Sequence, residues 1–495
     1  MNKFLVAAAL ATTTALVPFA GQAQMKDSVS IGMRLEPTPG LDPSQGAAAA
    51  ISQVTWYNIF EGLVRINEQG VIQPMLAKSW KISDDGLNYT FNLERGVKFH
   101  DGADFTASDI KFTIEKAAAE ESSNKNKGMY QSVSSVETPD DHTVVVSLKA
   151  PNALFLFKSA QSTGAVIDPA SAENNMTNPI GTGPYKFVRW TKGDSVDMEL
   201  FADHRNARNI KIKKAKFRFI NDANAQVNAL LTGGLDYMPS LSAPEMFKQF
   251  QSDPKFTALQ GTTEGETILT INNKAGPLAD VRVRRAIQHA IDRRALIDAA
   301  VEGYGTPIGS HFAPHNAAYV DLTGMYPYDP AKSRALLKEA GAENLELTLR
   351  LPPPTYARRG GEVIAGMLSE VGINAKIENV EWPIWIGQVF KEKQFDLTIV
   401  SHVEPMDMNN YTKPDYYWQY DSADFRDIYG KFERSTTPAE QTKWLQAAQR
   451  KIAEDAVNGF LFEGAKLGVA QKGLTGMWAS WPSFINEVAA LSWEG

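Results

Sequence analysis

The chain has 495 residues, of which 43% are hydrophobic and 22% charged, and it contains no cysteine. This length exceeds what one compact core accommodates and predicts two or three domains. The lack of cysteine excludes disulfides, thiolate metal sites and cysteine nucleophiles. Without Lys3 and the rest of residues 1–23 the formal charge is 49 minus 57, or −8, which argues against nucleic acid or an anionic membrane as the main partner.

Residues 1–23 have the pattern of a cleavable secretory signal peptide. Lys3 supplies the positive start, residues 4–20 are mostly apolar, and Gly21 and Ala23 are the small residues before a cut at Gln24. No twin-arginine pair and no cysteine accompany the cut, so the pattern predicts export without a lipid anchor. No later run of about 18 apolar residues occurs, so we expect a soluble mature chain.

Residues 73–116 predict a strand followed by a helix, each preceded by a turn or capping signal. Asp84-Asp85-Gly86 is a turn signal, and Tyr89, Phe91 and Leu93 then alternate with polar residues, as in a half-buried strand. Thr106 and Asp109 have the spacing of a capping box, and the residues after them have helical spacing. Before this unit, residues 47–60 predict a helix that ends at Asn-Ile-Phe-Glu-Gly-Leu, residues 58–63.

Residues 178–187 read Asn-Pro-Ile-Gly-Thr-Gly-Pro-Tyr-Lys-Phe. The Gly-x-Gly pair, Gly181 and Gly183, is not a dinucleotide loop, because the third glycine is missing, Pro184 follows at once and a strand comes next. We interpret both glycines as structural and expect them to allow a tight crossing between domains. The basic cluster at residues 211–218 alternates with apolar residues and predicts a strand with a charged outer face.

The second half of the chain predicts a separate lobe. A strand at residues 266–272 precedes a long amphipathic helix over residues 281–301, whose arginines 284, 285, 293 and 294 we expect on its solvated faces. Another helix opens at Pro330. Residues 345–400 alternate strand, helix, strand, helix, strand, which predicts a parallel sheet with functional loops at the carboxyl ends of its strands.

The sequence resembles the family 5 solute-binding proteins of ABC importers, which bind dipeptides, oligopeptides or nickel. The segments that carry the resemblance are residues 58–63, 73–116 and 178–187 and the two helices that begin near residues 281 and 330. The resemblance implies an α/β, two-lobed periplasmic binding protein fold, type II-like and of cluster C, with an extra small α/β domain and a hinge between the lobes near residues 265 and 465. The expected domains are a signal peptide at 1–23, domain I at 24–62, 181–264 and 466–495, domain II at 63–180, and domain III at 265–465.

The same resemblance implies a function. The expected protein is a periplasmic monomer without a cofactor, which captures a small peptide or peptide-like solute by lobe closure and delivers it to the membrane permease subunits of an ABC importer. Within this class, an opine or an oligosaccharide is the alternative ligand. A secreted hydrolase or a periplasmic chaperone is the remote alternative.

Catalytic motifs are absent from the sequence. No Gly-x-Ser-x-Gly elbow, His-Glu-x-x-His motif or Walker loop occurs, so we expect no enzyme. His311 and His315 are four residues apart, but Pro314 breaks any helix that would align them, and no third ligand is evident. We therefore expect no metal site there.

The candidate ligand site follows the strand that ends at residue 400. Its loop contains His402, Glu404, Asp407, Asn409 and Tyr411. In peptide-binding relatives an aspartate of the equivalent loop pairs with the ligand's amino terminus, and here Asp407 or Glu404 is the candidate, because the usual Asp-Pro-Asp has become Glu-Pro-Met-Asp. A buried carboxylate holds an ammonium strongly where water is excluded. A loop that caps the next helix is the alternative interpretation.

A carboxylate anchor and aromatic residues complete the expected site. The resemblance places an arginine at the start of a helix like residues 356–359 on the ligand's carboxylate, so Arg358 or Arg359 is the candidate, and a planar guanidinium grips a carboxylate with two bonds. Trp385, Tyr417 and Trp418 are aromatics that we expect to stack on a sugar, an opine or a peptide side chain, although most buried tryptophans simply pack.

Overall fold

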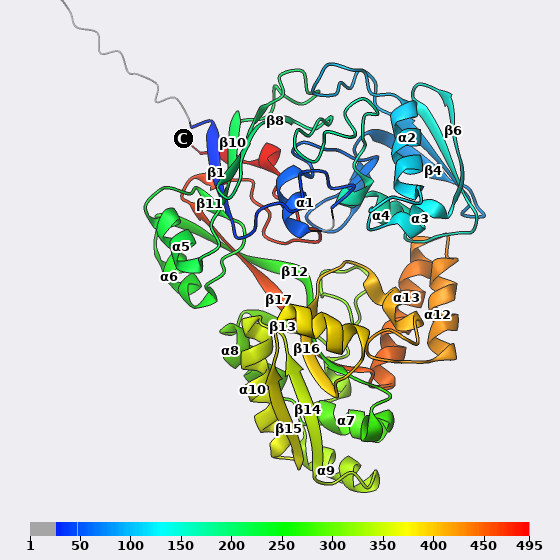
Figure 1. The fold of residues 1–495 in the computed structure, drawn as a ribbon, viewed down its shortest axis with the longest axis vertical. Helices are drawn as coiled ribbons and strands as arrows, with labels where there is room; N and C mark the ends of the chain where they lie inside the picture. The colour runs from blue at the N-terminus through cyan, green and yellow to red at the C-terminus, as the bar shows by residue number, and fades with distance from the viewer. Residues whose placement is uncertain (1–25, 47, 495) are drawn as a thin grey trace, which may run out of the picture.

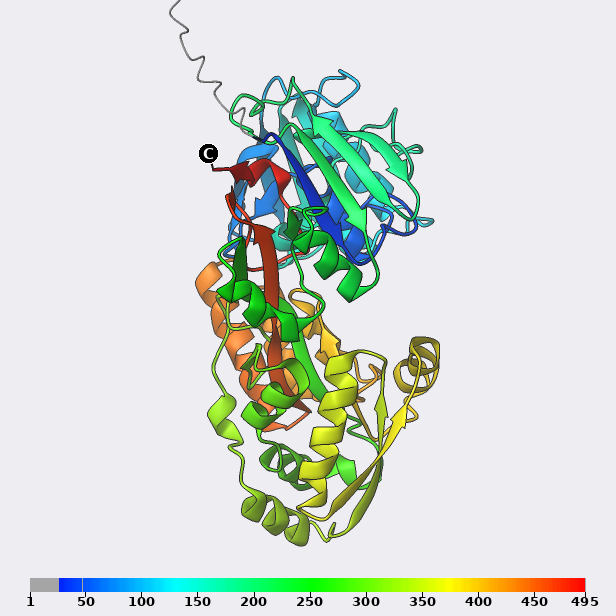
Figure 2. The same cartoon turned by 90° about the vertical axis from the view of Figure 1, so that its left-hand side faces the viewer.

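The computed structural model describes residues 26–46 and 48–494, so the predicted signal peptide at 1–23 lies outside the described part. Two lobes lie one above the other along the long axis of the molecule, and both described ends of the chain are in the upper lobe (Figures 1 and 2). Two long strands, β12 (Phe256–Ile271) and β17 (Asn458–Gln471), run from one lobe into the other. They pass through the positions near 265 and 465 where the sequence predicts the hinge. None of the described helices has the length and apolar character of a membrane span.

A single mixed sheet continues through both lobes. Its strand order is β15-β14-β16-β12-β17-β11-β1-β10-β9-β8, and β13 pairs with β17 at the side. The strands of the upper lobe are β1 (Ser28–Met33), β8 (Tyr185–Thr191), β9 (Ser195–Leu200), β10 (Lys214–Phe219) and β11 (Tyr237–Met238). Those of the lower lobe are β13 (Gly305–Pro307), β14 (Leu345–Leu351), β15 (Ile373–Asn379) and β16 (Leu397–His402). Between Thr262 and Glu266 the register of β12 against β17 shifts, which interrupts the ladder where the lobes meet.

A small α/β domain occupies one side of the upper lobe. Its four strands pair in the order β4-β5-β7-β6, with bounds β4 (Ala77–Ile82), β5 (Asn88–Leu93), β6 (Val133–Asp140) and β7 (Thr143–Leu148). The predicted strand residues Tyr89, Phe91 and Leu93 are all buried in its core, together with residues of α2 (Ala107–Ala118). The predicted capping box is confirmed, because the Thr106 N–H donates to the Asp109 carboxylate at 2.8 Å.

The other short elements of the upper lobe surround this domain and the main sheet. They are α1 (Ala49–Thr55), β2 (Val64–Ile66), β3 (Ile72–Pro74), α3 (Lys127–Gln131), α4 (Phe155–Ser159), α5 (Ala223–Leu231), α6 (Phe247–Ser252), β18 (Leu474–Thr475) and β19 (Ser492–Trp493). The helix predicted over 47–60 is shorter than expected. It ends at Thr55, because Trp56 is extended and Tyr57 has a positive φ of 63°.

The lower lobe is built on the predicted parallel strands. β14 pairs in parallel with both β15 and β16, which confirms the parallel arrangement. The surrounding helices are α7 (Val281–His289), α8 (Arg293–Val301), α9 (Pro330–Glu339), α10 (Thr355–Ser369), α11 (Trp382–Ile384), α12 (Ala423–Glu433) and α13 (Pro438–Glu454). The lobes also touch beyond the hinge, since the Ala153 N–H donates to the Glu433 carbonyl at 3.1 Å and Leu154 packs into the core beside α12.

The prediction of one long helix over 281–301 is wrong. The segment forms α7 and α8, and Asp292 starts the second helix by accepting from the Arg294 and Ala295 N–H groups. The prediction that all four arginines of this segment lie on solvated faces is also wrong for two of them. Arg284 is buried and donates to four backbone carbonyls, those of Leu278, Ala279, Asp455 and Ala456. Arg293, which is half-buried, likewise donates to the Phe460 carbonyl at 2.6 Å, so both side chains satisfy backbone acceptors.

The glycine pair at 181 and 183 lies where two segments of the upper lobe cross. The Gly183 N–H donates to the Ile59 carbonyl at 2.9 Å. A Cβ placed on Gly183 would lie 2.4 Å from the Asn58 carbonyl oxygen, and one on Gly181 would lie 2.1 Å from that of Ile59. The predicted structural role of these glycines is confirmed, because backbone atoms occupy the space that a side chain would need.

We therefore expect Gly183→Ala to lower the free energy of unfolding by about 2–4 kcal/mol, since rigid backbone must move to admit the methyl group. Chemical denaturation followed by tryptophan fluorescence measures this loss. Gly366→Ala is the matched control, because a Cβ placed on Gly366 within α10 would have no atom within 4 Å, and alanine favours helix. Equal stability of Gly183→Ala and the wild type would contradict the crossing argument.

Candidate functional site

A cavity of about 490 Å³ lies between the two lobes. Its volume falls within the range of about 300–1,000 Å³ that small-molecule sites occupy. The upper lobe contributes residues 46, 49, 52, 125, 126, 157, 158, 161–163, 481, 483 and 484, and the lower lobe contributes residues 403–407, 409, 410 and 413. Glu264 of β12 lines it from the hinge. Because both lobes line it, closure of the lobes would enclose its contents.

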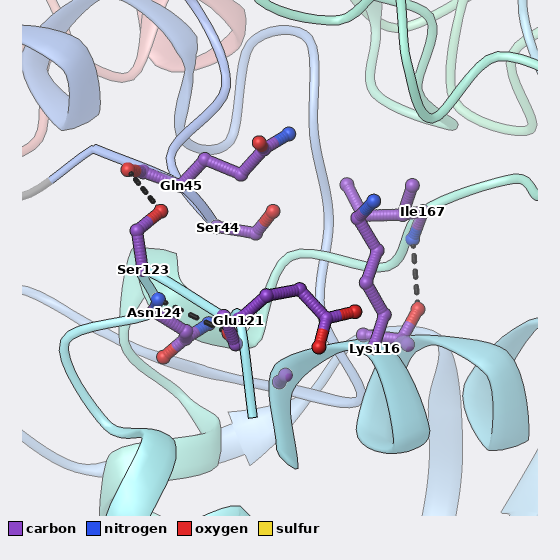
Figure 3. Close-up of a pocket in the computed structure, with 10 residues that line it drawn as sticks. Ser44, Gln45, Lys116, Glu121, Ser123, Asn124 and Ile167 are labelled. Atoms are coloured by element: carbon purple, nitrogen blue, oxygen red, sulfur yellow. Dashed lines mark hydrogen bonds between the residues drawn. The ribbon is translucent and has the colours of Figure 1, made fainter. Parts of the chain in front are cut away.

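A second, smaller cavity lies within the upper lobe (Figure 3). Its volume is about 120 Å³, and its walls include Gln45, Lys116 and Asn124. The Ser123 hydroxyl donates to the Gln45 carbonyl at 3.0 Å across its edge. This space is too small for a peptide-sized solute. The interlobe cavity is the candidate site because the predicted site residues Glu404, Asp407 and Asn409 line it.

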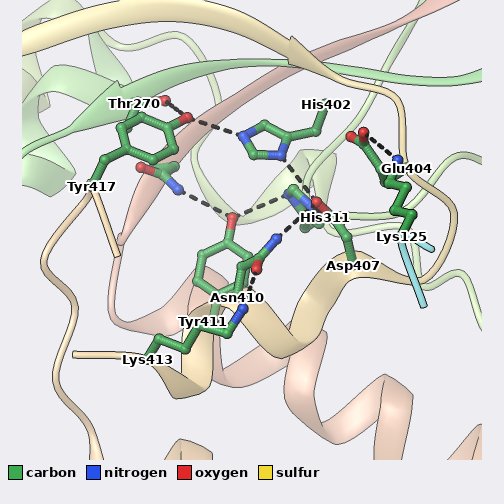
Figure 4. Close-up of polar contacts among 11 residues, drawn as sticks. Lys125, Thr270, His311, His402, Glu404, Asp407, Asn410, Tyr411, Lys413 and Tyr417 are labelled. Carbon is green, nitrogen blue, oxygen red and sulfur yellow. Dashed lines mark hydrogen bonds and ion pairs between the residues drawn. The ribbon is translucent and has the colours of Figure 1, made fainter. Parts of the chain in front are cut away.

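Asp407 is held between two imidazoles at the floor of the interlobe cavity (Figure 4). Its Oδ1 lies 2.7 Å from His311 Nε2, and its Oδ2 lies 3.0 Å from His402 Nδ1. The Asn410 amide donates to the same Oδ2 at 3.1 Å. Burial acts to raise the pKa of Asp407, but the charge and hydrogen bonds of the two histidines outweigh burial and hold this pKa well below its usual range.

The outer nitrogens of both imidazoles bond tyrosine hydroxyls. Tyr411 OH lies 3.1 Å from His311 Nδ1, and Tyr417 OH lies 3.0 Å from His402 Nε2. Asn458 and Thr270 bond the two hydroxyls in turn. Each of the four imidazole nitrogens therefore has a hydrogen-bond partner. The loop that carries Asp407 is thereby fixed to the core of the lower lobe.

His311, His402 and Asp407 also form a donor set of the kind that transition metals bind, with ligand atoms within 4.8 Å of one another. The sequence shows no third ligand near His311, and the structure supplies two from about ninety residues further along, His402 at the end of β16 and Asp407 in the segment after it. His315, the other histidine of that pair, instead bonds Glu264 at 2.6 Å. The same ligand atoms take part in the hydrogen bonds described above.

The other predicted site residues fall into three groups. Asn409 and Glu404 line the cavity, and Glu404 forms an ion pair with Lys125 of the upper lobe at 2.9 Å. Arg358 pairs with Glu381 at 3.0 Å and Arg359 with Glu302 at 3.1 Å, so neither lines the cavity. The predicted aromatics are buried in the core of the lower lobe, below the cavity: Trp385, Tyr411, Tyr417 and Trp418.

Three glutamates gather at the hinge, under the cavity. Glu266 faces Glu463 and His402 across neighbouring strands of the sheet. Glu463 Oε1 accepts the Thr263 N–H at 2.8 Å, while Glu266 Oε2 is buried without a partner among the described residues. Burial raises the pKa of Glu463 to about 7 and, with the charge of Glu264, raises that of Glu266 well above its usual range. The buried glutamates therefore hold protons where an exposed glutamate would not.

Sequence reasoning missed the residues that the upper lobe gives to the cavity. Lys158 and Gln161 come from α4 and the turn after it, and Trp481 and Phe484 come from the C-terminal return. The two aromatics and Ala49 also line an adjoining, mainly apolar cavity of about 440 Å³. The Trp-x-x-Phe pattern close to a predicted hinge strand is the one sequence feature that could have identified these two aromatics as cavity residues, but nothing local distinguishes it from aromatic residues that pack in a core.

Comparisons with known proteins agree on one family. The family model described as bacterial extracellular solute-binding proteins, family 5 Middle, matches residues 71–424. The glutathione-binding protein of Salmonella choleraesuis is 30% identical over 385 residues, which cover 76% of this chain and 73% of that protein.

Solved structures show the same fold. An ABC transporter substrate-binding protein of Listeria monocytogenes superposes with a TM-score of 0.86 at 23% identity, covering 95% of this chain and 100% of that one. A periplasmic binding protein of Helicobacter pylori, in complex with the peptide STSA, gives a TM-score of 0.79 at 24% identity, with 95% and 99% covered.

Proposed function

Because the chain belongs to the bacterial extracellular solute-binding proteins of family 5, we propose that it binds a zwitterionic peptide or peptide-like solute between its lobes and presents it to the permease subunits of an ABC importer. The signal-like residues 1–23 support export, and we place the mature protein in the periplasm as a monomer.

The balance of charges in the interlobe cavity carries this proposal. Its lining contains three lysines, at 125, 158 and 413, and three carboxylates, at 264, 404 and 407. Two of the lysines come from the upper lobe, whereas the carboxylates come from the lower lobe and the hinge. A ligand with both an ammonium and a carboxylate matches this division, because opposite charges attract strongly once closure of the lobes excludes water.

The adjoining apolar cavity supports a ligand with at least one apolar side chain. It shares the wall residues Ala49, Trp481 and Phe484 with the charged cavity, so the two spaces are neighbours. Apolar walls with a few placed polar groups are typical of small-ligand sites. A peptide fills both spaces, with its charged groups in one and a side chain in the other.

The relatives support the same class of ligand. A 30%-identical relative is named for glutathione, and a structural neighbour holds the peptide STSA. Glutathione is a peptide-like molecule with one ammonium and two carboxylates, and it therefore suits a cavity whose lining includes Lys158 and Lys413, two lysines without a carboxylate partner among the described residues. We take both compounds as probes.

Calorimetry on protein stripped of co-purified ligand by reversible unfolding tests the proposal. The panel is glutathione, Ser-Thr-Ser-Ala, a dipeptide series, an opine and an oligosaccharide. We expect at least one peptide or glutathione to bind at micromolar concentration or tighter and the oligosaccharide not to bind. Binding of the opine or the sugar alone would refute the peptide class. Mass spectrometry of the recovered ligand adds a second check, since cleavage of it would indicate a hydrolase.

A further inference from the structure

We infer that Lys158 and Gln161 of the upper lobe, together with Lys413 of the lower lobe, form an anion subsite that holds the carboxylate of the bound solute. This inference rests on the proposed function and names the residues that recognise one end of its ligand. All three side chains line the interlobe cavity.

The upper-lobe part of the subsite offers two donors that lack acceptors. Lys158 belongs to α4, and Gln161 follows one turn later, where its N–H donates to the Lys158 carbonyl at 3.2 Å. Gln161 Nε2 is buried and has no hydrogen-bond partner in the described part of the chain. The Lys158 ammonium likewise makes no hydrogen bond or ion pair within residues 26–46 and 48–494, although it is half-buried. Partly buried donors without acceptors are costly unless a ligand supplies the acceptor.

The lower-lobe part is positioned by the network around Asp407. The Lys413 ammonium donates to Asn410 Oδ1 at 2.9 Å, and Asn410 donates to Asp407 in turn. Figure 4 shows Lys413 and Asn410 beside this cluster. Lys413 is therefore held at the edge of the cavity, on the lobe opposite Lys158.

The two lysines are close enough to repel each other. Burial lowers the pKa of Lys158 first, and the charge of Lys413 lowers it further, while Glu433 of α12 opposes both effects only in part. A carboxylate bound between the two ammonium groups removes this repulsion and forms charge-assisted hydrogen bonds with both lobes. Since its donors come from both lobes, the anion stabilises their closed arrangement more than their open one.

The other cations near the cavity are already paired. Arg358 and Arg359, the anchors expected from sequence, bond Glu381 and Glu302 outside the cavity. Lys125 is paired with Glu404. Among the described residues that line the cavity, Lys158 and Lys413 are thus the lysines without a carboxylate partner.

The test compares free-acid and C-terminally amidated forms of glutathione and Ser-Thr-Ser-Ala by calorimetry. We expect the wild type to prefer the acid form of the better probe by about 10- to 100-fold. Lys158→Gln should weaken binding of the acid by a similar factor and change binding of the amide by less than about threefold. Lys158→Arg, which keeps the charge, should retain the preference for the acid.

Lys248→Gln is the matched control, because Lys248 is an exposed lysine on α6 of the same lobe and does not line the cavity. A thermal melt confirms that Lys158→Gln folds. Equal affinity of Lys158→Gln and the wild type for the acid, or equal loss of acid and amide, would overturn the subsite while leaving the peptide proposal intact. If neither probe binds, the acid and amide forms of whichever dipeptide of the panel binds replace them in this comparison, and binding of no peptide of the panel would refute the peptide proposal, and the subsite with it.

Discussion

Replacing Asp407 with alanine will lower the free energy of unfolding by about 3–5 kcal/mol, because it removes the shared acceptor of a buried network. His311, His402 and Asn410 all bond this carboxylate. His311 is fully buried, so its Nε2–H would lose its only acceptor away from water. Chemical denaturation at pH 7 measures the loss. Glu404→Ala in the same loop is the control, since its half-exposed ion pair contributes at most about 1 kcal/mol.

The pH dependence of this loss identifies its origin. Burial acts to raise the pKa of Asp407, but the two histidines hold this pKa well below its usual range. The contribution of Asp407 to the free energy of unfolding is therefore complete above the unfolded pKa of about 4 and declines as the pH falls below that value. The stability difference between wild type and Asp407→Ala should therefore shrink below about pH 4. If Asp407 served only as a ligand anchor, the variant would lose binding and keep its stability at every pH.

The sequence predicted the architecture well because its signals are local or belong to long recognisable stretches. Turn residues, alternating aromatics and the Thr106–Asp109 cap depend on neighbours in the chain, and the structure forms them as expected. The failures have tertiary causes. Arg284 and Arg293 carry a helical pattern typical of solvated faces, yet carbonyls from segments far along the chain bind them. No periodicity within the helix contains that information.

The site was predicted only in part for the same reason. The loop with His402, Glu404, Asp407 and Asn409 follows the end of a predicted strand, so its place at the cavity could be expected from topology. The pairing of Asp407 with His311 joins residues 96 positions apart, and no local pattern links them. The arginine anchors were assigned by resemblance alone, and the structure pairs both with glutamates. Their role at the ligand stays a prediction.

The hinge strand β17 places two buried ionisable residues where the lobes join. Glu463 and Lys466 are each about 1% exposed. Burial raises the pKa of Glu463 from 4.5 to about 7 and lowers that of Lys466 from 10.5 to about 7. The Lys466 ammonium donates to the Trp478 carbonyl and lies 5.0 Å from the ring centre of Trp481, a residue of the cavity wall. The Glu463 carboxyl and the Lys466 ammonium therefore each change charge near pH 7.

These two residues make opposite contributions to the pH dependence of the free energy of unfolding, and the sum of their two contributions is smallest near pH 7. From pH 4.5 to about 7 the folded chain keeps the Glu463 proton that the unfolded chain has lost, so stability falls as the pH rises. From about 7 to 10.5 the unfolded chain keeps the Lys466 proton that the folded chain has lost, so stability rises again. Each limb amounts to about 3–5 kcal/mol by linkage.

Two substitutions separate the limbs of this profile. Glu463→Gln should reduce the fall below pH 7, where the raised pKa of Glu266 acts in the same direction, and Lys466→Met should remove the contribution that grows above pH 7, because each substitution removes a titrating group while keeping its approximate volume. Denaturation at half-unit pH intervals provides the curves. Lys472→Met, at an exposed lysine just beyond β17, should leave both limbs unchanged. Parallel curves for Lys466→Met and the wild type above pH 7 would show that Lys466 keeps its charge at the hinge, and the argument from burial would then fail.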